Sequence, residues 1–439
     1  MRQLIPIIFI GFCSLTYAQP ERIIGNFSGL GVRAMGLGGA FVAVADDFSA
    51  SYWNPAGLAQ IKDRKLDVTF FRKSHVNKST FNETRESIGL SNTGFSSMGF
   101  VYPYPVYQGS LVFAIGFNQI VDMDWGLRQT GFDNLDSLQT RHYFQHEGQL
   151  TLSSISAAVD VSPFISFGGT LGFVGGEDRH FNEFFYLDVN DKYTYKNLRG
   201  EDTFLDDYEG ARSLRLGALI RLPRETPRLR IGATVQSSIG QEVRYQFRGN
   251  PQGYTSIEYD SDDLETLEKV SLRGRYEIKL PLQYAIGASY FPIQGLLLSA
   301  GLSVSEWSQS DYVCCDEQQE PLRAETKFDR QYRDIVRHHF GVEWEVPEIA
   351  LDLRAGYYTD PLPFVGPYTS SDPPIDIKRD RRFITVGAGL LLDQVVQLDI
   401  GWIKGSSEQV EVMVDSGNKN VLGQETIVTR IFFNIGYEF

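Results

Sequence analysis

Cysteine is scarce in this sequence, with three in 439 residues. Cys13 falls in the apolar stretch near the N-terminus, and Cys314 and Cys315 are adjacent. A disulfide between adjacent cysteines cannot cross-link distant parts of a chain of this size, and no C-x-x-C spacing offers a zinc site. We expect Cys314 and Cys315 to be an oxidised or inert loop pair, and we keep a redox or metal role as the less favoured alternative.

Long hydrophobic runs are absent after the first residues. Residues 1–18 have the form of a secretory signal peptide, with Arg2 before the apolar run from Leu4 to Leu15 and small residues up to Ala18. Beyond them no run reaches the roughly 18 apolar residues that a membrane-spanning helix needs. A transmembrane β-barrel is still possible, because each of its strands needs only about 10 alternating residues.

Positive charge is in short supply, since 41 Lys and Arg face 55 Asp and Glu, for a formal net charge of −14. An acidic chain is a poor partner for nucleic acid. No G-x-S-x-G motif marks a hydrolase nucleophile. The sequence therefore predicts neither a nucleic-acid-binding protein nor an enzyme, and it indicates no cofactor.

The histidines do not predict a metal site. His142 and His146 are four residues apart and share a face of a strand, but no third ligand is identifiable from the sequence, so we expect both to be solvated. His338 and His339 should point to opposite faces of a strand and cannot easily share an ion.

Alternation of apolar with polar or small residues is what this sequence has in abundance. From Ser213 to Leu222 the side chains of Leu214, Leu216 and Ile220 fall on one face of an extended chain, and those of Arg215 and Arg221 fall on the other. A period of two residues is typical of a strand with one apolar face.

The same alternation recurs along the chain in pairs of strands joined by short turns. Two single strands, at 66–70 and at the C-terminus, complete a predicted antiparallel all-β barrel of about 14 strands, an even number as in single-chain outer-membrane barrels. The paired strands are 98–102 with 111–117, 150–161 with 165–173, 214–222 with 229–235, 282–290 with 296–304, 340–346 with 349–357, and 384–392 with 396–402.

Long polar links separate these hairpins, and we expect them to be extracellular loops, because short turns on one side and long loops on the other are typical of outer-membrane barrels. Several links contain strand-like runs, such as Val270 to Leu280, so we expect some strands to project beyond the membrane. The alternative fold, a secreted β-sandwich, does not explain this alternation of short turns with long links. Carboxylates in the links, from Asp260 to Glu268 and at Asp206 and Asp207, should be solvated or bridged by divalent cations at a lipopolysaccharide surface. The links are 73–95, 120–147, 176–211, 239–281, 306–335, 359–381 and 405–425.

The last strand carries a further signal. In TIVTRIFFNIGYEF, apolar side chains from Ile427 to Phe439 recur at alternate positions and end on a terminal phenylalanine. This ending resembles the assembly signal of outer-membrane barrels, which implies the barrel assembly machinery as a partner.

The segment GLGVRAMGLGGAFVAVADDFSASYWNPAGLAQ, residues 29–60, is rich in glycine and small residues. It lacks the preceding strand that a phosphate-binding loop requires. Its G-x-G-G-A, A-x-A-D-D and W-N-P-A-G-L-A elements resemble the N-terminal signature of the FadL-type outer-membrane transporter family. The resemblance implies a signal peptide at 1–18, a hatch at 19–62 lodged inside the lumen, and a barrel with long extracellular loops at 63–439.

The resemblance also implies site residues. It makes Asn54, Pro55, Ala56 and Gly57 the hinge between hatch and barrel, with a purely structural turn as an equal alternative. We expect polar side chains here to satisfy buried backbone groups. The remaining hatch residues are Gly36, Gly38, Gly39, Asp46 and Asp47.

Four aromatic residues in an expected outer loop are candidate ligand contacts. The alternative, which we favour, is that they pack against one another within the loop. They are Phe181, Phe184, Phe185 and Tyr186.

The function implied is passive uptake of hydrophobic small molecules, such as long-chain fatty acids, across the outer membrane of a Gram-negative bacterium. The hatch would gate this uptake, and the partners would be membrane lipid, lipopolysaccharide and the hydrophobic substrate. The same signature also resembles PorV-type barrels of the type IX secretion system, which bind protein cargo. The sequence leaves both functions open, and it leaves open whether the barrel wall has a lateral opening.

Overall fold

The computed structural model describes residues 27, 29–223, 228–250, 252–315, 327–367, 372–415 and 417–439. The expected signal peptide at 1–18, and residues 19–26 of the expected hatch, lie outside the described residues. Among the described residues, no helix is both long and apolar enough to cross a membrane.

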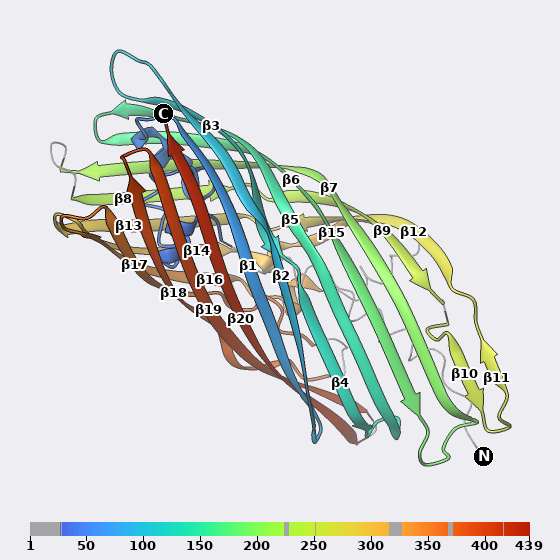
Figure 1. Ribbon diagram of the computed structural model, residues 1–439. Helices are drawn as coiled ribbons and strands as arrows, with labels where there is room; N and C mark the ends of the chain where they lie inside the picture. Colours follow the sequence, from blue (N-terminus) through green and yellow to red (C-terminus); the bar gives the residue numbers. More distant parts are fainter. Residues whose placement is uncertain are drawn as a thin grey trace.

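The strands form one closed antiparallel barrel (Figure 1). Strand β1 (Lys65–Phe81) pairs with β2 (Thr84–Tyr104) on one side and with β20 (Asn418–Glu438) on the other, so the first and last strands close the wall. The other strands are β3 (Leu111–Asp122), β4 (Trp125–Asp133), β5 (Leu138–Ser162), β6 (Ile165–Leu187), β7 (Tyr195–Leu222), β8 (Leu229–Gln236), β9 (Ile239–Gly249), β10 (Ser256–Tyr259), β11 (Leu264–Thr266), β12 (Val270–Leu280), β13 (Gln283–Ile293), β14 (Leu296–Ser305), β15 (Asp311–Cys315), β16 (Ile335–Val346), β17 (Leu351–Thr359), β18 (Asp376–Leu392) and β19 (Val396–Asp415).

The barrel wall has 14 strand positions, as the alternation predicts. Four positions each hold two consecutive strands separated by a short break: β3 with β4, β8 with β9, β12 with β13, and β14 with β15. Strands β10 and β11 add a small ribbon to the far end of β7.

Apolar side chains point outward in a belt around the part of the wall nearer the C-terminus. Ile115, Ile286 and Ile384 are 56%, 55% and 55% exposed. Water would make such a continuous apolar surface unfavourable, whereas the hydrocarbon of a bilayer accommodates it. We name this zone the apolar belt, and its short turns lie at the same end of the barrel as the C-terminus (Figure 1).

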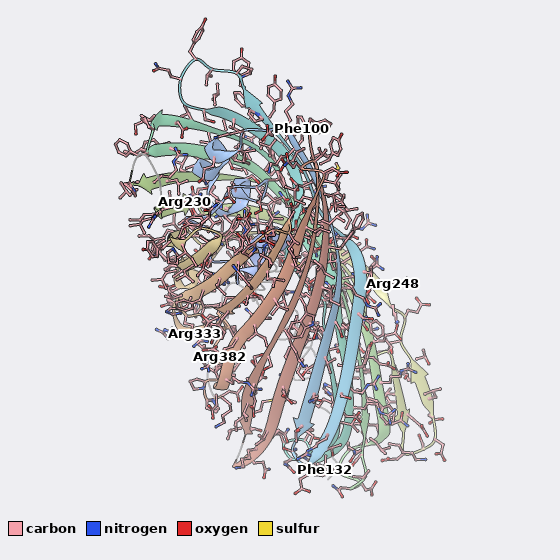
Figure 2. All side chains as sticks on the ribbon, turned by 60° about the vertical axis from the view of Figure 1, so that its left-hand side comes forward. Phe100, Phe132, Arg230, Arg248, Arg333 and Arg382 are labelled. Atoms are coloured by element: carbon pink, nitrogen blue, oxygen red, sulfur yellow. The ribbon has the colours of Figure 1, made fainter. Side chains whose placement is uncertain are left out.

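Beyond the apolar belt, on the side away from the short turns, the strands continue. This confirms the expected strand at Val270 to Leu280, which is β12, whereas the loops expected in most of the other links are wrong. The link at 73–95 is a hairpin with its turn at residues 82–83, and the links at 176–211 and 405–425 are likewise mostly strand. The outward positions here are polar, for example Arg141 and Glu147 on β5, so the apolar contrast that reveals strands is lost although backbone pairing continues. We call this region, at the end of the barrel away from the short turns, the extension; Phe132 and Arg248 lie in it (Figure 2).

The N-terminal segment, residues 29–61, lies inside the barrel near the short-turn end (Figure 1). It contains α3 (Val32–Gly36), α4 (Ala50–Trp53) and the 3-10 helix η1 (Pro55–Gln60), and its side chains Leu37, Phe41 and Leu58 are fully buried. Two short helices lie farther along the chain, η2 (Trp307–Gln309) and α6 (Phe328–Gln331).

Glycines on the inner face of the wall make room for this segment. A Cβ atom at Gly217 would lie 2.1 Å from Oδ1 of Asn54, and one at Gly168 would lie 2.4 Å from the carbonyl carbon of Pro55. Gly168 and Gly217 are direct cross-strand partners on β6 and β7. The small residues of the wall and of the segment therefore fit each other, because only residues without a side chain allow such close backbone approach.

Candidate functional site

A cavity of about 150 Å³, the lumen cavity, lies inside the barrel above the N-terminal segment. Its lining is mixed, with rings and aliphatic groups facing charged side chains. The apolar lining comes from Trp125, Leu362, Pro363, Phe364, Ile375, Phe383 and Val428, and the charged lining from Lys73, Asp122, Asp124, Asp360, Arg381, Glu411 and Arg430.

The charged groups of the lumen cavity have partners: six of them form ion pairs, and Glu411 accepts hydrogen bonds from Gln409 and Gln424. The Arg381 Nη2 atom lies 2.8 Å from Oδ2 of Asp360, and Oδ1 of Asp360 accepts a hydrogen bond from Nε of Arg337 at 2.6 Å. Arg430 donates a hydrogen bond to the carbonyl oxygen of Phe27 at 3.0 Å, which ties the cavity to the chain just before the N-terminal segment. Paired charges leave the apolar groups as the surface available to a ligand.

The N-terminal segment separates the lumen cavity from a second cavity of about 460 Å³ at the short-turn end. The second cavity is lined by Arg33, Asp46, Glu343 and Arg354 among others, and no described residue lines both cavities. A molecule in the lumen cavity therefore meets the N-terminal segment on the direct route to the short-turn end.

The wall opens sideways between β2 and β3. Strand β2 pairs with β3 only from Ser97 to Tyr104, and β4 pairs with β5 instead of continuing this ladder. In the described chain, residues 84–96 of β2 have no hydrogen-bonded strand on this side. A cavity of about 800 Å³, the wall gap, occupies this place, and its lining includes Gly89, Ser91, Gly94, Phe95 and Phe117.

Aromatic rings lie at the membrane-facing rim of the wall gap. Phe95 and Phe117 stack with ring centroids 5.9 Å apart, and Phe70 meets Phe95 edge-on at 6.0 Å. All three rings are more than a third exposed. The rim is therefore continuous with the apolar belt.

Lys73 and Asp124 line both the lumen cavity and the wall gap. Nζ of Lys73 lies 2.9 Å from Oδ2 of Asp124 and also contacts Asp122. Asp124 lies above the apolar belt, beside Gly148, whose amide donates to it at 3.1 Å. Burial raises the pKa of Asp124 and outweighs the opposing effect of Lys73. This ion pair is the partition between the lumen cavity and the wall gap.

The expected hinge residues form a tight turn against the wall. Nδ2 of Asn54 donates to the carbonyl oxygens of Val42 at 2.7 Å and Ala218 at 3.0 Å, and its Oδ1 accepts from the amide of Ala56 at 3.2 Å. Pro55 opens η1, where its missing N–H costs nothing. These bonds confirm that Asn54 satisfies backbone groups, and a gating role stays a prediction.

The other expected hatch residues also lie in the N-terminal segment. Gly38 and Gly39 have φ angles of +63° and +71°, which favour glycine, and a Cβ at Gly38 would lie 2.7 Å from the amide of Tyr357. Asp46 pairs with Arg33 and, at 3.4 Å, with Arg230, which lies near the short-turn end (Figure 2). Asp47 accepts from the amide of Ser49 at 2.8 Å, Gly57 packs against Ala45, and the carbonyl of Gly36 accepts from Thr385.

The four expected ligand-contact aromatics do not form one loop cluster. They lie in strand β6, where Phe184 and Tyr186 point inward and are buried, while Phe181 and Phe185 point to the other face. The inward pair belongs to a cluster with Tyr195 and other residues at the far end of the extension. None of the four lines the lumen cavity. Their role as ligand contacts stays a prediction.

Three further expectations are wrong. His146 is 1% exposed, not solvated, and Asp206 is 4% exposed, because both face the interior of the extension. His142 is half-buried, and burial lowers its pKa to about 4. The adjacent cysteines lie in strand β15, where Cys314 pairs with Glu277, and not in a loop. His338 and His339 do point to opposite faces, as expected.

The sequence of residues 24–429 matches the family described as outer membrane protein transport protein (OMPP1/FadL/TodX). The chain belongs to this family. Membership of this family places the protein in the outer membrane of a Gram-negative bacterium, among transporters of hydrophobic compounds. No curated protein matches the sequence significantly.

Solved structures share the fold at low sequence identity. A FadL homologue from Pseudomonas aeruginosa superposes with a TM-score of 0.65 at 14% identity, over 94% of this chain and 100% of that chain. The toluene transporter TodX of P. putida gives 0.62 at 14%, over 94% and 99%. The toluene transporter TbuX of Ralstonia pickettii gives 0.53 at 16%, over 94% and 99%.

Proposed function

We propose that the protein is a passive channel through which small hydrophobic molecules enter the lumen cavity from outside and leave sideways through the wall gap into the membrane. The observation that carries this proposal is the wall gap itself, which adjoins the lumen cavity across the Lys73–Asp124 pair. The N-terminal segment acts as a hatch that closes the direct route to the short-turn end.

The size of the lumen cavity bears on the substrate. About 150 Å³ is the volume of an engineered apolar cavity that binds benzene. A compact molecule of about that size fits entirely, whereas a long-chain fatty acid fits only with part of its chain extended toward the wall gap. Transfer from water stabilises either ligand by roughly 0.8 kcal/mol for each buried CH₂ group.

The Lys73–Asp124 pair provides a gate for lateral exit. Both groups are buried, so separating them costs more than separating a surface pair. Asp122 offers Lys73 a second carboxylate when Asp124 moves aside. The ammonium group therefore keeps a partner when the partition opens.

Filling the wall gap tests the proposal. Gly89 lines the gap on the outward face of β2, and a Cβ there would meet only Val76 at 3.8 Å, so Gly89→Trp places an indole at the outer mouth of the gap without backbone strain. We expect uptake of a labelled hydrophobic compound by cells to fall at least about tenfold, while the barrel assembles normally.

The matched control is Gly210→Trp on β7, where a Cβ would meet nothing within 4 Å. This variant should transport as the parent does. Equal uptake by the Gly89→Trp variant and the parent would show that the wall gap is not the exit. The alternative function as a carrier of protein cargo has no observation in its favour among the described residues.

A further inference from the structure

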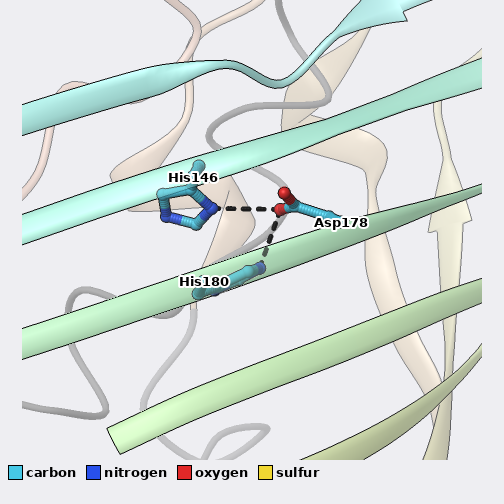
Figure 3. A group of neighbouring side chains, drawn as sticks. All are labelled: His146, Asp178 and His180. Carbon is cyan, nitrogen blue, oxygen red and sulfur yellow. Dashed lines mark hydrogen bonds and ion pairs between the residues drawn. The ribbon is translucent and has the colours of Figure 1, made fainter. Parts of the chain in front are cut away.

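Two histidines and two aspartates converge in the extension, beside the lumen cavity but outside the Lys73–Asp124 pair. His146 on β5 and His180 on β6 are direct cross-strand partners. Asp178 lies two residues before His180 and so shares its face, and Asp206 on β7 lies directly opposite Asp178. The register of three strands therefore brings the four side chains to one inward-facing spot, and Figure 3 shows three of them, His146, Asp178 and His180.

The contacts within this group centre on one carboxylate. Oδ2 of Asp178 lies 3.0 Å from Nδ1 of His146 and 2.7 Å from Nε2 of His180 (Figure 3). Oδ2 of Asp206 lies 3.2 Å from the same Nε2 atom. In a tetrahedral zinc site with bonds of about 2.0–2.1 Å, neighbouring ligand atoms lie about 3.3 Å apart. The three observed contacts are shorter than this spacing by about 0.1 to 0.6 Å, and the ligand atoms of His146, Asp178 and His180 all lie within 4.8 Å of one another, so small side-chain shifts bring them to it.

Hydrogen bonds within the protein satisfy this group only in part, because Nδ1 of His146 bonds to Oδ2 of Asp178 while other polar atoms of the group have no such partner. Both ring nitrogens of His180 and Oδ1 of Asp178 are buried without a hydrogen-bond partner, and the two side chains are 1% and 0% exposed. The short contact between Nε2 and Oδ2 thus lacks the angle of a hydrogen bond. Buried polar atoms normally have a partner, which is often a bound water or ion where the protein supplies none.

The surroundings favour a compact ion. Gly148 lies opposite Asp178, and a Cβ there would lie 2.8 Å from Oδ1 of Asp178, so glycine keeps the space beside the carboxylate free. The ring of Phe144 packs 4.7 Å from that of His146 and shields it. His146 also lines the lumen cavity, which provides an entry route.

We propose that His146, Asp178 and His180 bind one divalent transition-metal ion of the zinc class, with Asp206 as the fourth ligand. Imidazole nitrogen combined with carboxylate oxygen suits such ions better than it suits calcium or magnesium, which prefer oxygen alone. The ion would join β5, β6 and β7 where the membrane no longer supports them. It would stabilise the extension, and its presence does not depend on the transport proposal.

Zinc binding by the purified full chain in detergent tests this site. Competition with a chromogenic chelator should show one Zn²⁺ per chain, and Co²⁺ should give the visible absorption of a tetrahedral site. Asp178→Asn and His180→Asn should each lower zinc affinity at least about 100-fold, since even residues that only orient metal ligands contribute about 10–100-fold. Zinc should also raise the thermal unfolding temperature of the parent, and a chelator should reverse this.

His142→Asn is the matched control, because His142 lies four residues earlier on β5, faces inward and contacts Phe184 and Tyr186 instead of the proposed ligands. Its zinc affinity should stay within about twofold of the parent. His146→Asn provides a third ligand variant if one of the others does not assemble. A parent chain that binds no stoichiometric zinc would overturn the proposal, as would a control that loses as much affinity as the ligand variants.

Discussion

The two halves of the barrel interior are filled in different ways. At the level of the apolar belt, the N-terminal segment fills the lumen, and wall glycines such as Gly168 and Gly217 are shaped to receive it. In the extension, side chains of the wall itself fill the space, as in the aromatic cluster around Phe184 and the histidine group around Asp178. The half within the apolar belt is a socket for the N-terminal segment, and the interior of the extension is filled by side chains of its own strands.

This difference places the functional features at the junction of the halves. The lumen cavity and the wall gap lie where the N-terminal segment ends and the extension begins, beside the break between β3 and β4. Neither packing mode fills this level completely. A pathway for a small molecule can persist there without weakening either half.

Filling the space that the wall glycines leave for the N-terminal segment should cause the largest loss of stability. In Gly217→Val the new side chain overlaps Oδ1 of Asn54, which would lie 2.1 Å from its Cβ. The turn at Asn54 must move, so its hydrogen bonds to Val42 and Ala218 are lost. We expect about 3–5 kcal/mol of lost stability from overpacking and unsatisfied carbonyls together, measured by denaturant unfolding and by heat-modifiability on gels.

Gly210→Val on the same strand serves as the comparison, because nothing lies within 4 Å of a Cβ at that position. Its stability should stay close to that of the parent. If the two variants lost equal stability, the loss would come from valine on β7 and not from the socket.

Removing the side-chain amide of Asn54 should cause an intermediate loss of stability. Asn54→Ala leaves the buried carbonyl of Val42 and the amide of Ala56 without their partner, so we expect a loss of about 2 kcal/mol. Denaturant unfolding measures the loss, and uptake of a labelled hydrophobic compound is measured in parallel. Intact assembly with altered uptake supports a gating role, whereas failed assembly supports a purely structural turn.

Asn190→Ala, at an exposed position in the turn between β6 and β7, controls for loss of an asparagine side chain. We expect it to change neither stability nor uptake. The contrast between the two asparagines separates a socket contact from a general effect of the substitution.

The sequence predicts the apolar belt well and the extension poorly, for a physical reason. On strands such as β13, outward Ile286 and Tyr290 alternate with small residues, so the contact with hydrocarbon leaves a visible period of two. On β5, outward Arg141 and Glu147 meet water, and inward His146 is polar as well, so the same backbone pairing leaves no contrast. The number of strands follows from the belt alone.

The candidate sites show the same limit. The family signature locates the Asn54 turn, because its bonds are short-range or fall on an expected strand. The wall gap depends on where the β2–β3 ladder stops, and no residue type marks that point. The histidine group depends on the register of three strands, although the D-x-H spacing of Asp178 and His180, on one face of a strand, was a usable signal.

We expect the smallest loss of stability when a carboxylate in the socket is neutralised, and we compare it with a carboxylate on the outer surface of the extension. Glu343 accepts from Nη2 of Arg33 and from Nε of Arg354, each at 2.7 Å, and only 11% of its side chain is exposed. Arg354 keeps Asp399 at 2.6 Å when Glu343 is neutralised, so Glu343→Gln should cost only about 1–1.5 kcal/mol. Glu242 faces Arg275 at 3.8 Å and is 43% exposed, so Glu242→Gln should cost less than about 0.5 kcal/mol. Denaturant unfolding of both variants measures the contrast, and equal losses would mean that burial of Glu343 in the socket adds nothing to its ion pairs.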